Sequence, residues 1–503
     1  MWRHLKTCFR DHHHRVLFRG PGWDRTYGEV WNAAGARANV WKHRYGETLD
    51  KPGSRVFLIR ENGVTWMEEF LAAMHLEKSV VILSPKMPTN ILKEKIRDGG
   101  GGIVCSDTPA LAPVLDVSRV AARRRDDEEP TITLVTSGSS SGLLRQEVEL
   151  GSSQILTNLR QIDRVVDDKM ISSGDTSFSL LPWSHCYGLT CELLSLTGRG
   201  ASLYIPSRDG TSLGQQLRTA RPTLFFAVPF LLEKILAQLG PLSRLVNKGM
   251  AASLLNRLVL GGRLRSVSVG GARMGRGNLV SFENTLGVTI YEGYGMTEAS
   301  PMVSLNTRQH YRQGSVGKPL PGVDVYVDPT TDEILVRGEN VAKNLEKDRY
   351  IFLPERPGLS YYKTGDRGHL DRDGFLYVVD RLKDHFKLAN GLFVYPQKIE
   401  EVYHKYRPLA IQQWVVFQDP RPLHSNDLVL MGILETGTPH ATHHLMTQDL
   451  IEFGKKEGLL HYEIPRAICY TTMEDVKDMF TEKRTPRRGL LRDYFAVISG
   501  IKS

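Results

Sequence analysis

Two hydrophobic periods alternate in the first part of the chain. Residues 54–60 and 80–83 are short apolar runs typical of buried strands, and residues 65–76 place their large apolar side chains on one helical stripe. Strand, helix and strand at this spacing predict a βαβ unit, and therefore a parallel sheet flanked by helices. Further buried strands are predicted at 131–135 and 264–269.

The second part of the chain has a different hydrophobic pattern. Residues 323–327 and 333–338 alternate between Gly/Pro turns, which predicts a small antiparallel β-subdomain. A compact α+β segment is expected after about Lys383. Its predicted elements are strands at 411–417 and 428–434 and a helix at 447–457. Because 503 residues exceed what one core holds, at least two domains are expected.

Turns and charges alternate in the stretch from Tyr361 to Glu400. Turns are predicted at Gly365-Asp366 and at Asp373-Gly374, with short alternating strands between and after them. A dense charge cluster follows, made of Asp380, Arg381, Lys383, Asp384 and Lys387. Taken alone, this cluster is typical of a hairpin with a solvated charged face.

Two loops of small residues follow predicted strands. Thr136 to Gly142 follows the strand at 131–135, and Gly270-Gly271-Ala272 follows the strand at 264–269. Small side chains leave backbone N–H groups open to phosphate oxygens and let a flat ring lie against the chain. In open α/β sheets, ligands bind at these carboxyl ends of strands. Alone, the loop from Thr136 to Gly142 is a weak signal, because Ser/Gly loops are usually only flexible connections.

Composition narrows the class of protein. The content of 41% hydrophobic and 24% charged residues is typical of a soluble globular protein, and the longest apolar run, residues 224–232, is too short to span a bilayer. The net charge of +9 favours anionic ligands, but basic residues occur along the whole chain and do not indicate nucleic acid. Five cysteines without metal-type spacing predict a reduced, cytoplasmic environment. The basic N-terminus keeps a mitochondrial location as the alternative.

At their fixed spacings, several strings resemble the adenylate-forming superfamily of acyl- and aryl-CoA ligases, peptide-synthetase adenylation domains and luciferases. Residues 364–400 resemble its Thr-Gly-Asp, Gly-Arg-x-Lys-Asp and Pro-x-x-Ile-Glu motifs and depart at Asp380, where the family has glycine. Residues 180–188 resemble Leu-Pro-x-x-His-x-x-Gly, and residues 294–298 match Tyr-Gly-x-Thr-Glu. The phosphate loop departs more strongly, because Gln146 stands where the family has lysine.

The resemblance implies an α/β fold class. A large N-terminal domain, residues 1–380, would combine doubly wound α/β subdomains with the β-subdomain and bind the nucleotide and the carboxylate. A small α+β domain, residues 381–503, would be mobile about a hinge at Lys383.

The resemblance also implies a nucleotide site. Tyr294 would offer its ring to adenine, Asp366 would bind the ribose hydroxyls, and Arg381 would lie at the ribose–phosphate region. The residues implied in nucleotide binding are Thr136, Ser137, Gly138, Ser139, Ser140, Gly270, Gly271, Ala272, Tyr294, Gly295, Asp366 and Arg381.

Catalytic roles follow from the same motifs. Thr297 would offer a hydroxyl to the α-phosphate, and Glu298 a hard oxygen ligand to Mg²⁺. His185 and Gly188 would border the carboxylate pocket, and Lys387 and Gly391 would form the loop that acts in the thioester step.

The family's C-terminal catalytic lysine has two candidate positions. Alignment on Leu491-Arg492 puts Gly489 there, which would leave the enzyme defective, whereas alignment on Thr481 puts Lys483 there. We adopt Lys483. A solvated basic tail is the alternative interpretation of this region.

The implied activity is ATP-dependent activation of a carboxylic acid, with a fatty acid favoured, to an acyl-adenylate and then a thioester of CoA. The implied cofactors are ATP, Mg²⁺ and CoA, and no nucleic acid or transmembrane segment is expected. Three alternatives stay open: transfer to a carrier-protein thiol, a degenerate member that binds nucleotide without turnover, and an unrelated interaction protein.

Overall fold

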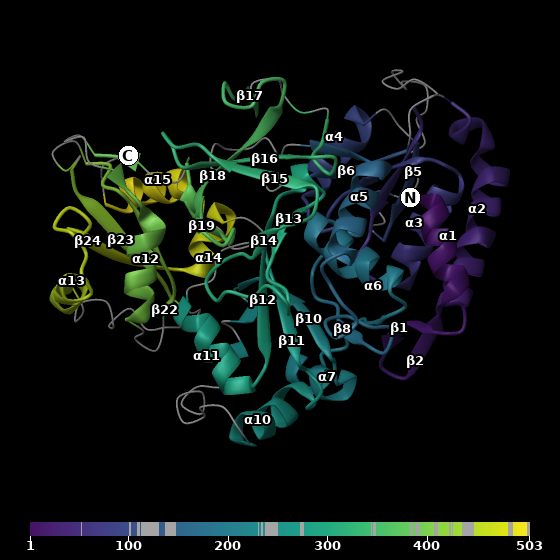
Figure 1. Cartoon of the computed structure of the whole chain (residues 1–503), viewed down its shortest axis with the longest axis horizontal. Coiled ribbons are helices and arrows are strands. Elements are labelled where there is room, and N and C mark those ends of the chain that lie inside the picture. Colours follow the sequence, from purple (N-terminus) through teal and green to yellow (C-terminus); the bar gives the residue numbers. More distant parts are fainter. Residues whose placement is uncertain are drawn as a thin grey trace.

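The computed structural model shows two large sheets, a β-subdomain and a C-terminal α+β unit (Figure 1). The structure describes residues 1–51, 53–99, 102–107, 111, 130–135, 147–229, 231–232, 235–236, 250–271, 276–343, 345, 349–382, 386–388, 393–406, 411–421, 424, 426–434, 447–480 and 486–499. Within these residues, no helix combines the length and apolar character needed to cross a bilayer.

The first sheet has five strands in the order β5-β3-β4-β6-β7. Its first four strands are parallel and β7 pairs antiparallel with β6. The predicted βαβ unit is confirmed, because β3, α3 and β4 form it with Arg55 opposite Ser79. The strands are β3 (Arg55–Ile59), β4 (Ser79–Ile82), β5 (Gly102–Ser106), β6 (Thr131–Val135) and β7 (Glu147–Gly151), and the neighbouring helices are α2 (Tyr27–Leu49), α3 (Val64–His75), α4 (Thr89–Asp98) and α5 (Ser152–Asp163).

The second sheet has nine strands in the order β14-β13-β12-β11-β10-β8-β9-β1-β2, parallel from β12 to β1. One apolar core joins both sheets, since Leu58 of β3 and Phe226 of β10 belong to the same cluster of buried side chains. The strands are β1 (Val16–Gly20), β2 (Trp23–Thr26), β8 (Thr176–Phe178), β9 (Ser202–Tyr204), β10 (Leu224–Ala227), β11 (Ser266–Val269), β12 (Thr289–Gly295), β13 (Met302–Leu305) and β14 (Lys318–Pro319). The helices of this part are α1 (Trp2–Asp11), the π-helix η3 (Tyr187–Leu194), α6 (Ser195–Gly198), α7 (Leu213–Ala220), α10 (Met250–Leu260), α11 (Arg276–Leu286) and the 3-10 turn η4 (Thr297–Ala299).

The predicted β-subdomain is an antiparallel sheet of β15 (Val323–Val327), β16 (Glu333–Gly338), β17 (Tyr350–Phe352), β18 (Ser360–Leu370) and β19 (Leu376–Arg381). The predicted turn at Asp373-Gly374 joins β18 to β19. The prediction of a turn at Gly365-Asp366 is wrong, because both residues lie inside the continuous strand β18. Gly365 has a φ of 73°, and the register with β16 shifts between Glu333 and Leu335, so the signal marked a bulge.

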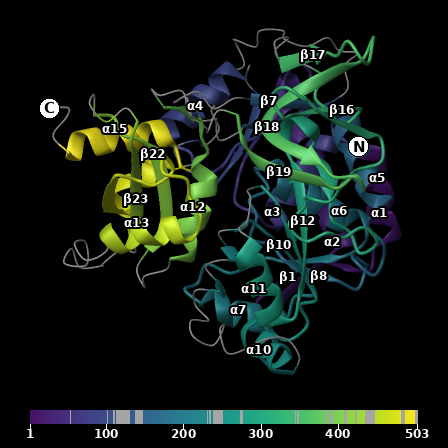
Figure 2. The same ribbon diagram turned by 60° about the vertical axis from the view of Figure 1, so that its left-hand side comes forward.

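The C-terminal unit is built on a three-stranded sheet, β22-β23-β24. It lies on one side of the molecule in both views (Figures 1 and 2). Alternate residues of β22 and β23 face two different apolar clusters, so the sheet is covered on both sides. These observations confirm the predicted fold class. The elements are β20 (Phe386–Lys387), β21 (Phe393–Val394), α12 (Pro396–Lys405), β22 (Ile411–Gln418), β23 (Leu428–Leu434), α13 (Thr447–Lys456), β24 (Ala467–Thr472), α14 (Met473–Val476), η8 (Lys477–Met479) and α15 (Arg488–Ile498).

Candidate active site

Asp366 lies between the nine-stranded sheet and the β-subdomain, where it contacts Arg381 and Tyr294. We call these three residues the polar corner. The side chain of Asp366 is 7% exposed, and Arg381 Nε lies 3.1 Å from its Oδ1. The hairpin register explains this pair, because Asp366 of β18 lies opposite Arg381 of β19. The bulge at Gly365 aims the carboxylate, so the motif glycine has a local structural reason.

Tyr294 completes the corner from β12. Its hydroxyl donates a 2.6 Å hydrogen bond to Oδ2 of Asp366. Burial and the Asp366 charge raise the pKa of Tyr294 well above its usual range, so the phenol stays a neutral donor. The motif predicted only a ring face for adenine. The role of the hydroxyl in holding Asp366 was missed, because a sequence shows no partner 72 residues away.

The turn after β12 presents the two predicted phosphate and metal residues. A Cβ on Gly295 would lie 2.1 Å from the carbonyl oxygen of Pro301, so only glycine allows this approach of β12 to β13. The chain then forms η4, which carries Thr297 and Glu298. The thiol of Cys186 lies 3.3 Å from Oγ1 of Thr297, which connects this turn to the segment before η3.

Glu298 fits the predicted cation site in its chemistry. The residue is 9% exposed, and none of the described residues donates a hydrogen bond or forms an ion pair with its carboxylate. Within the same residues, no cluster of three or more His, Cys, Asp or Glu could hold a metal. Magnesium is commonly held by one or two carboxylates together with nucleotide phosphates, so a lone buried carboxylate suits it.

Tyr362 borders Glu298 and was not predicted. Its hydroxyl accepts a 3.0 Å hydrogen bond from Arg349. Burial, followed by the nearby Glu298 charge, raises the pKa of the Tyr362 phenol above its usual range. The phenol therefore remains neutral beside the carboxylate.

The π-helix η3 is anchored by a buried carboxylic acid. Glu192 accepts hydrogen bonds of 3.0 Å from Ser177 and 2.9 Å from Ser179. Burial raises the pKa of Glu192 to about 8. This anchor fixes η3 against β8, and η3 in turn positions Tyr187 and Cys191.

His185 and Gly188, which were predicted to border the carboxylate pocket, flank Tyr187. A Cβ on Gly188 would lie 2.4 Å from the carbonyl oxygen of Pro182, so this glycine permits backbone packing. The half-buried His185 lies just before η3. Tyr187 and Cys191, from the same segment, line a cavity. The hydroxyl of Tyr187 donates to the Ser268 carbonyl oxygen at 3.0 Å.

Gly270 lies beside the ring of Tyr187. A Cβ at this position would approach the ring to 3.3 Å, a close contact that explains the missing side chain. Gly271, which follows, is exposed and has a φ of 80°, a backbone conformation that favours glycine. The two predicted glycines therefore directly follow β11, and Gly270 lies against a ring that lines the cavity.

The cavity is apolar and lies between η3, the end of α5 and strands β10 to β13. Its volume is about 30 Å³, room for only about two water molecules. No charged side chain lines it among the described residues. The lining residues are Ile162, Val166, Met170, Ile171, Tyr187, Cys191, Ser195, Leu224, Phe225, Phe226, Ser266, Ser268, Val269, Tyr291, Gly293, Met302 and Leu305.

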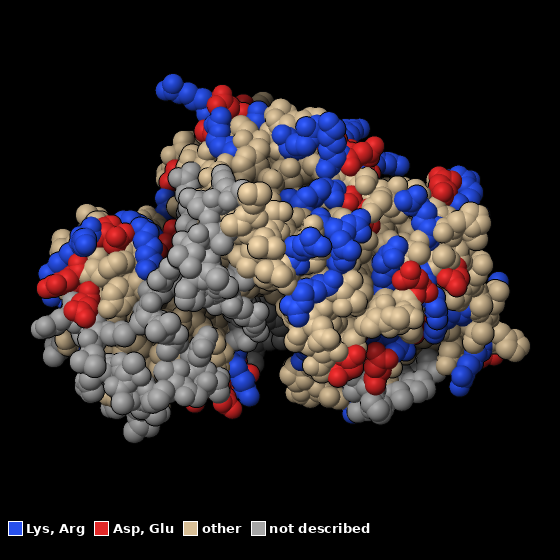
Figure 3. Space-filling view, turned by 90° about the horizontal axis from the view of Figure 1, so that it is seen from below, with Lys and Arg blue, Asp and Glu red and all other residues tan. Residues whose placement is uncertain are grey.

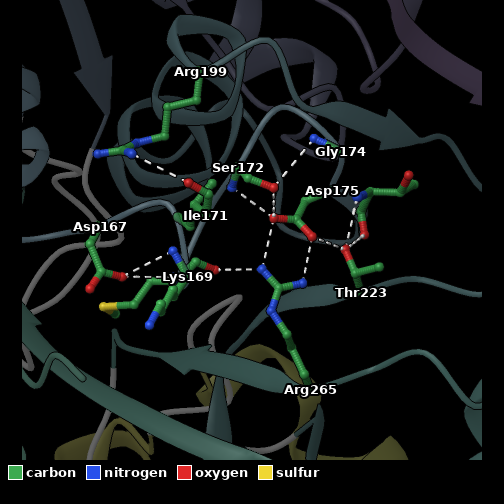
Figure 4. Close-up of polar contacts among 11 residues, drawn as sticks. Asp167, Lys169, Ile171, Ser172, Gly174, Asp175, Arg199, Thr223 and Arg265 are labelled. Carbon is green, nitrogen blue, oxygen red and sulfur yellow. Dashed lines mark hydrogen bonds and ion pairs between the residues drawn. The ribbon is translucent and has the colours of Figure 1, made fainter.

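An ion pair between Asp175 and Arg265 contacts the lining of this cavity through Met170 (Figure 4). Asp175 accepts hydrogen bonds of 2.7 Å from Arg265 and 2.7 Å from Thr223. Burial opposes ionisation, but these donors and the Ser172 amide hold the pKa of Asp175 below its usual range. Arg265 also donates to the carbonyl oxygen of Met170, a residue of the lining, at 2.9 Å.

Several predicted site residues lie outside the described part of the chain. They are Thr136, Ser137, Gly138, Ser139, Ser140, Ala272, Lys383, Gly391 and Lys483. Lys387 is described as part of β20, without its side chain. Among the described site residues, the structure brings together Tyr294, Asp366 and Arg381.

Two of the curated relatives with detectable similarity are long-chain-fatty-acid–CoA ligases. Long-chain-fatty-acid–CoA ligase 1 of Cavia porcellus is 28% identical over 378 residues, which is 65% of this chain and 54% of that protein. Long-chain-fatty-acid–CoA ligase FadD15 of Mycobacterium bovis is 27% identical over 401 residues, 72% of this chain and 63% of that protein. The chain thus spans about half to two thirds of the length of these relatives.

Solved structures align over nearly the whole chain and establish the fold. Anthranilate CoA ligase AuaEII in complex with anthranoyl-AMP has a TM-score of 0.78 at 19% identity, covering 99% of this chain and 98% of that chain. o-Succinylbenzoate CoA synthetase (MenE) from Bacillus subtilis, in complex with ATP and magnesium ion, has a TM-score of 0.72 at 20% identity, covering 97% and 99%.

The family model described as AMP-binding enzyme matches residues 6–344. This match includes Tyr294, Thr297 and Glu298 and extends over well more than half of the 503 residues. The chain therefore belongs to the AMP-binding enzyme family.

Proposed function

We propose that this chain joins a carboxylic acid to AMP and then transfers the acyl group to the thiol of CoA. The proposal rests on strand β12, which separates the apolar cavity from the polar corner at Asp366. Gly293 lines the apolar cavity, and the next residue, Tyr294, holds Asp366 in the polar corner. An apolar acyl site and a site for a hydroxyl-rich, anionic ligand thus meet on one strand.

The first step needs two anions to meet. A carboxylate oxygen attacks the α-phosphorus of ATP, a P–O bond forms, and the bond to pyrophosphate breaks. Asp366 would bind the ribose, Thr297 would donate to the α-phosphate, and Glu298 would hold Mg²⁺, which offsets the phosphate charge when bound. Lys483 would supply a cation at the reacting phosphate, and Gly270 and Gly271 would leave room for adenine.

The second step replaces AMP with sulfur. A thiolate attacks the acyl carbon, a C–S bond forms, and the C–O bond to AMP breaks. We assign Lys387 and Gly391 to the loop that faces the site in this step, after residues 381–503 rotate about Lys383 relative to residues 1–380.

The cavity favours an apolar acid, and we propose a fatty acid as the substrate. A second carboxylate would meet no cation in the described lining, which disfavours dicarboxylates. The names of the curated relatives support a long chain, whereas the structural neighbours AuaEII and MenE are named as ligases of anthranilate and of o-succinylbenzoate. A long chain requires the cavity to open beyond its present volume of about 30 Å³.

ATP–pyrophosphate exchange tests the first step with acids graded from acetate to palmitate, together with benzoate and succinate. We expect exchange with monocarboxylic apolar acids and none with succinate. Acyl transfer is then compared between CoA and a pantetheinylated carrier protein. ATP binding without exchange by any of these acids would contradict the proposal and identify a degenerate member, and transfer to the carrier alone would replace CoA as the acceptor.

A further inference from the structure

Basic residues occur along the whole chain, but their excess over acidic residues lies in one segment. Residues 212–282 contain ten Lys and Arg residues and a single carboxylate, Glu233, which gives the segment a formal net charge of +9. The whole chain also has a net charge of +9, so the rest of the chain is balanced. This segment includes α7, β10, α10 and β11.

Helix α10 in this segment is apolar on two faces. One face, with Leu255 and Leu260, is buried in the second core cluster. The other face is a stripe four residues apart along the helix, made of Met250, Leu254 and Leu258, with exposures of 91%, 58% and 57%. Large apolar side chains repeated on an exposed helical face indicate an interaction surface.

Four exposed arginines flank this stripe, which we call the α10 stripe. Arg218 of α7 donates to the carbonyl oxygen of Leu258 at 3.5 Å, and Arg221 donates to that of Gly261 at 3.1 Å. Arg257 lies on α10 and Arg263 follows it. None of these four forms an ion pair with a described residue. Figure 3 looks from below Figure 1, the side on which α7 and α10 lie, and Lys and Arg gather across that face.

We propose that the α10 stripe and its four arginines dock the protein on an anionic lipid bilayer. A helix that lies in the interface plane inserts its exposed apolar side chains among the acyl chains, while the neighbouring arginines pair with lipid phosphates. A second copy of the chain is a poorer occupant, because a two-fold interface would bring the same four arginines of both copies together. This docking is independent of the proposed reaction.

Co-sedimentation with vesicles tests the surface. The full chain is mixed with vesicles of phosphatidylcholine alone or with one third phosphatidylglycerol, at low and high salt. We expect binding to the mixed vesicles that weakens with salt. Arg218→Gln with Arg257→Gln should weaken it about 25-fold, at about fivefold for each arginine. Leu254→Gln with Leu258→Gln should abolish measurable binding to the mixed vesicles.

Matched controls separate docking from general surface change. Val40→Gln on α2 replaces another apolar residue of 58% exposure, and Arg337→Gln replaces an exposed arginine of β16; both should bind as the wild type does. Thermal unfolding should be the same for every variant. The proposal would be overturned if the wild-type protein did not bind the mixed vesicles, or if the variant with Leu254→Gln and Leu258→Gln still bound them. A dimer by light scattering that the leucine variant makes monomeric, without vesicle binding, would assign the α10 stripe to a second copy instead.

Discussion

The two sides of β12 are built in opposite ways. On one side, Tyr294 and Arg381 hold the single carboxylate of Asp366 through contacts of 2.6 and 3.1 Å. On the other side, many apolar side chains from η3, α5 and four strands enclose a cavity of about 30 Å³. Directional hydrogen bonds make the polar corner sensitive to one atom, whereas the cavity depends on summed contacts. A single substitution should therefore disable nucleotide binding but only shift the preference for the acid.

The largest effect is expected from Lys483→Ala. A cation at the reacting phosphate acts as the transition state forms, so adenylation should slow by about 10²–10³-fold. The rate of thioester formation from supplied acyl-adenylate and CoA should be unchanged in this variant. Lys477→Ala, an exposed lysine on η8, is the control. Arg488 is a weak substitute, because it pairs with both carboxylate oxygens of Glu400, one at 3.0 Å. An unchanged adenylation rate would reject Lys483.

Asp366→Ala should weaken ATP binding by about 1.5–3 kcal/mol, roughly 10- to 150-fold, because charge-assisted hydrogen bonds to the ribose are lost. Isothermal titration calorimetry with ATP measures the effect. Asp332→Ala removes the partner of Arg367, an ion pair of 2.7 Å in the same sheet, and should leave ATP affinity unchanged. Equal losses in both variants would point to damage to the sheet rather than to a ribose contact.

Asp175→Asn tests the ion pair between Asp175 and Arg265 next to the cavity and should lower the free energy of unfolding by about 1.5–3 kcal/mol at pH 7. The pKa of Asp175 is lowered in the folded state, so its contribution is present above the unfolded pKa of about 3.9 and is lost as pH falls through the folded value. Urea unfolding measures the difference in unfolding free energy between the wild type and Asp175→Asn, and we expect this difference to be smaller at pH 3 than at pH 7. Asp98→Asn, which removes an exposed pair with Arg97, should change little at either pH. If this difference did not depend on pH, the charge of Asp175 would not be the source of its contribution to stability.

Cys191→Leu should move the acid preference toward shorter chains by about tenfold in kcat/KM, because the added atoms fill the cavity. Cys191→Ala is the matched variant and should shift the preference toward longer chains. Exchange assays over graded acids measure both. If neither variant changes the ranking of acids, the cavity is not the acyl site.

The smallest effect is expected from Tyr294→Phe. Only one of the protein contacts of Asp366 is lost, so ATP binding should weaken by about 0.5–1.5 kcal/mol. Because the raised pKa keeps the phenol protonated, the loss should be equal at pH 7 and pH 9. A loss as large as that of Asp366→Ala would place the tyrosine, not the carboxylate, in the main role. Calorimetry on both variants under the same conditions decides this.

Local patterns in the sequence predicted the elements well where packing and periodicity agree. The strand at 428–434 matches β23 residue for residue, and the helix at 65–76 matches α3 within one residue at each end. The Gly365-Asp366 signal was misread, since a glycine with positive φ serves a turn and a bulge equally well, and only pairing with β16 distinguishes them. Gly188 and Gly295 belong to predicted site motifs, and the structure also gives each a close backbone neighbour that leaves no room for a Cβ, which the motifs do not reveal.

The sequence by itself determined the order of elements, because hydrophobic period is a local property of the chain. The motifs that contain Tyr294, Thr297, Glu298, Asp366 and Arg381 were found through their resemblance to the adenylate-forming superfamily. Only the tertiary structure decided which of these residues meet. The bond from Tyr294 to Asp366 joins residues 72 positions apart, and the cavity takes its wall from segments spread between Ile162 and Leu305. Contacts of this kind depend on how sheets pack and register, and no single segment encodes them.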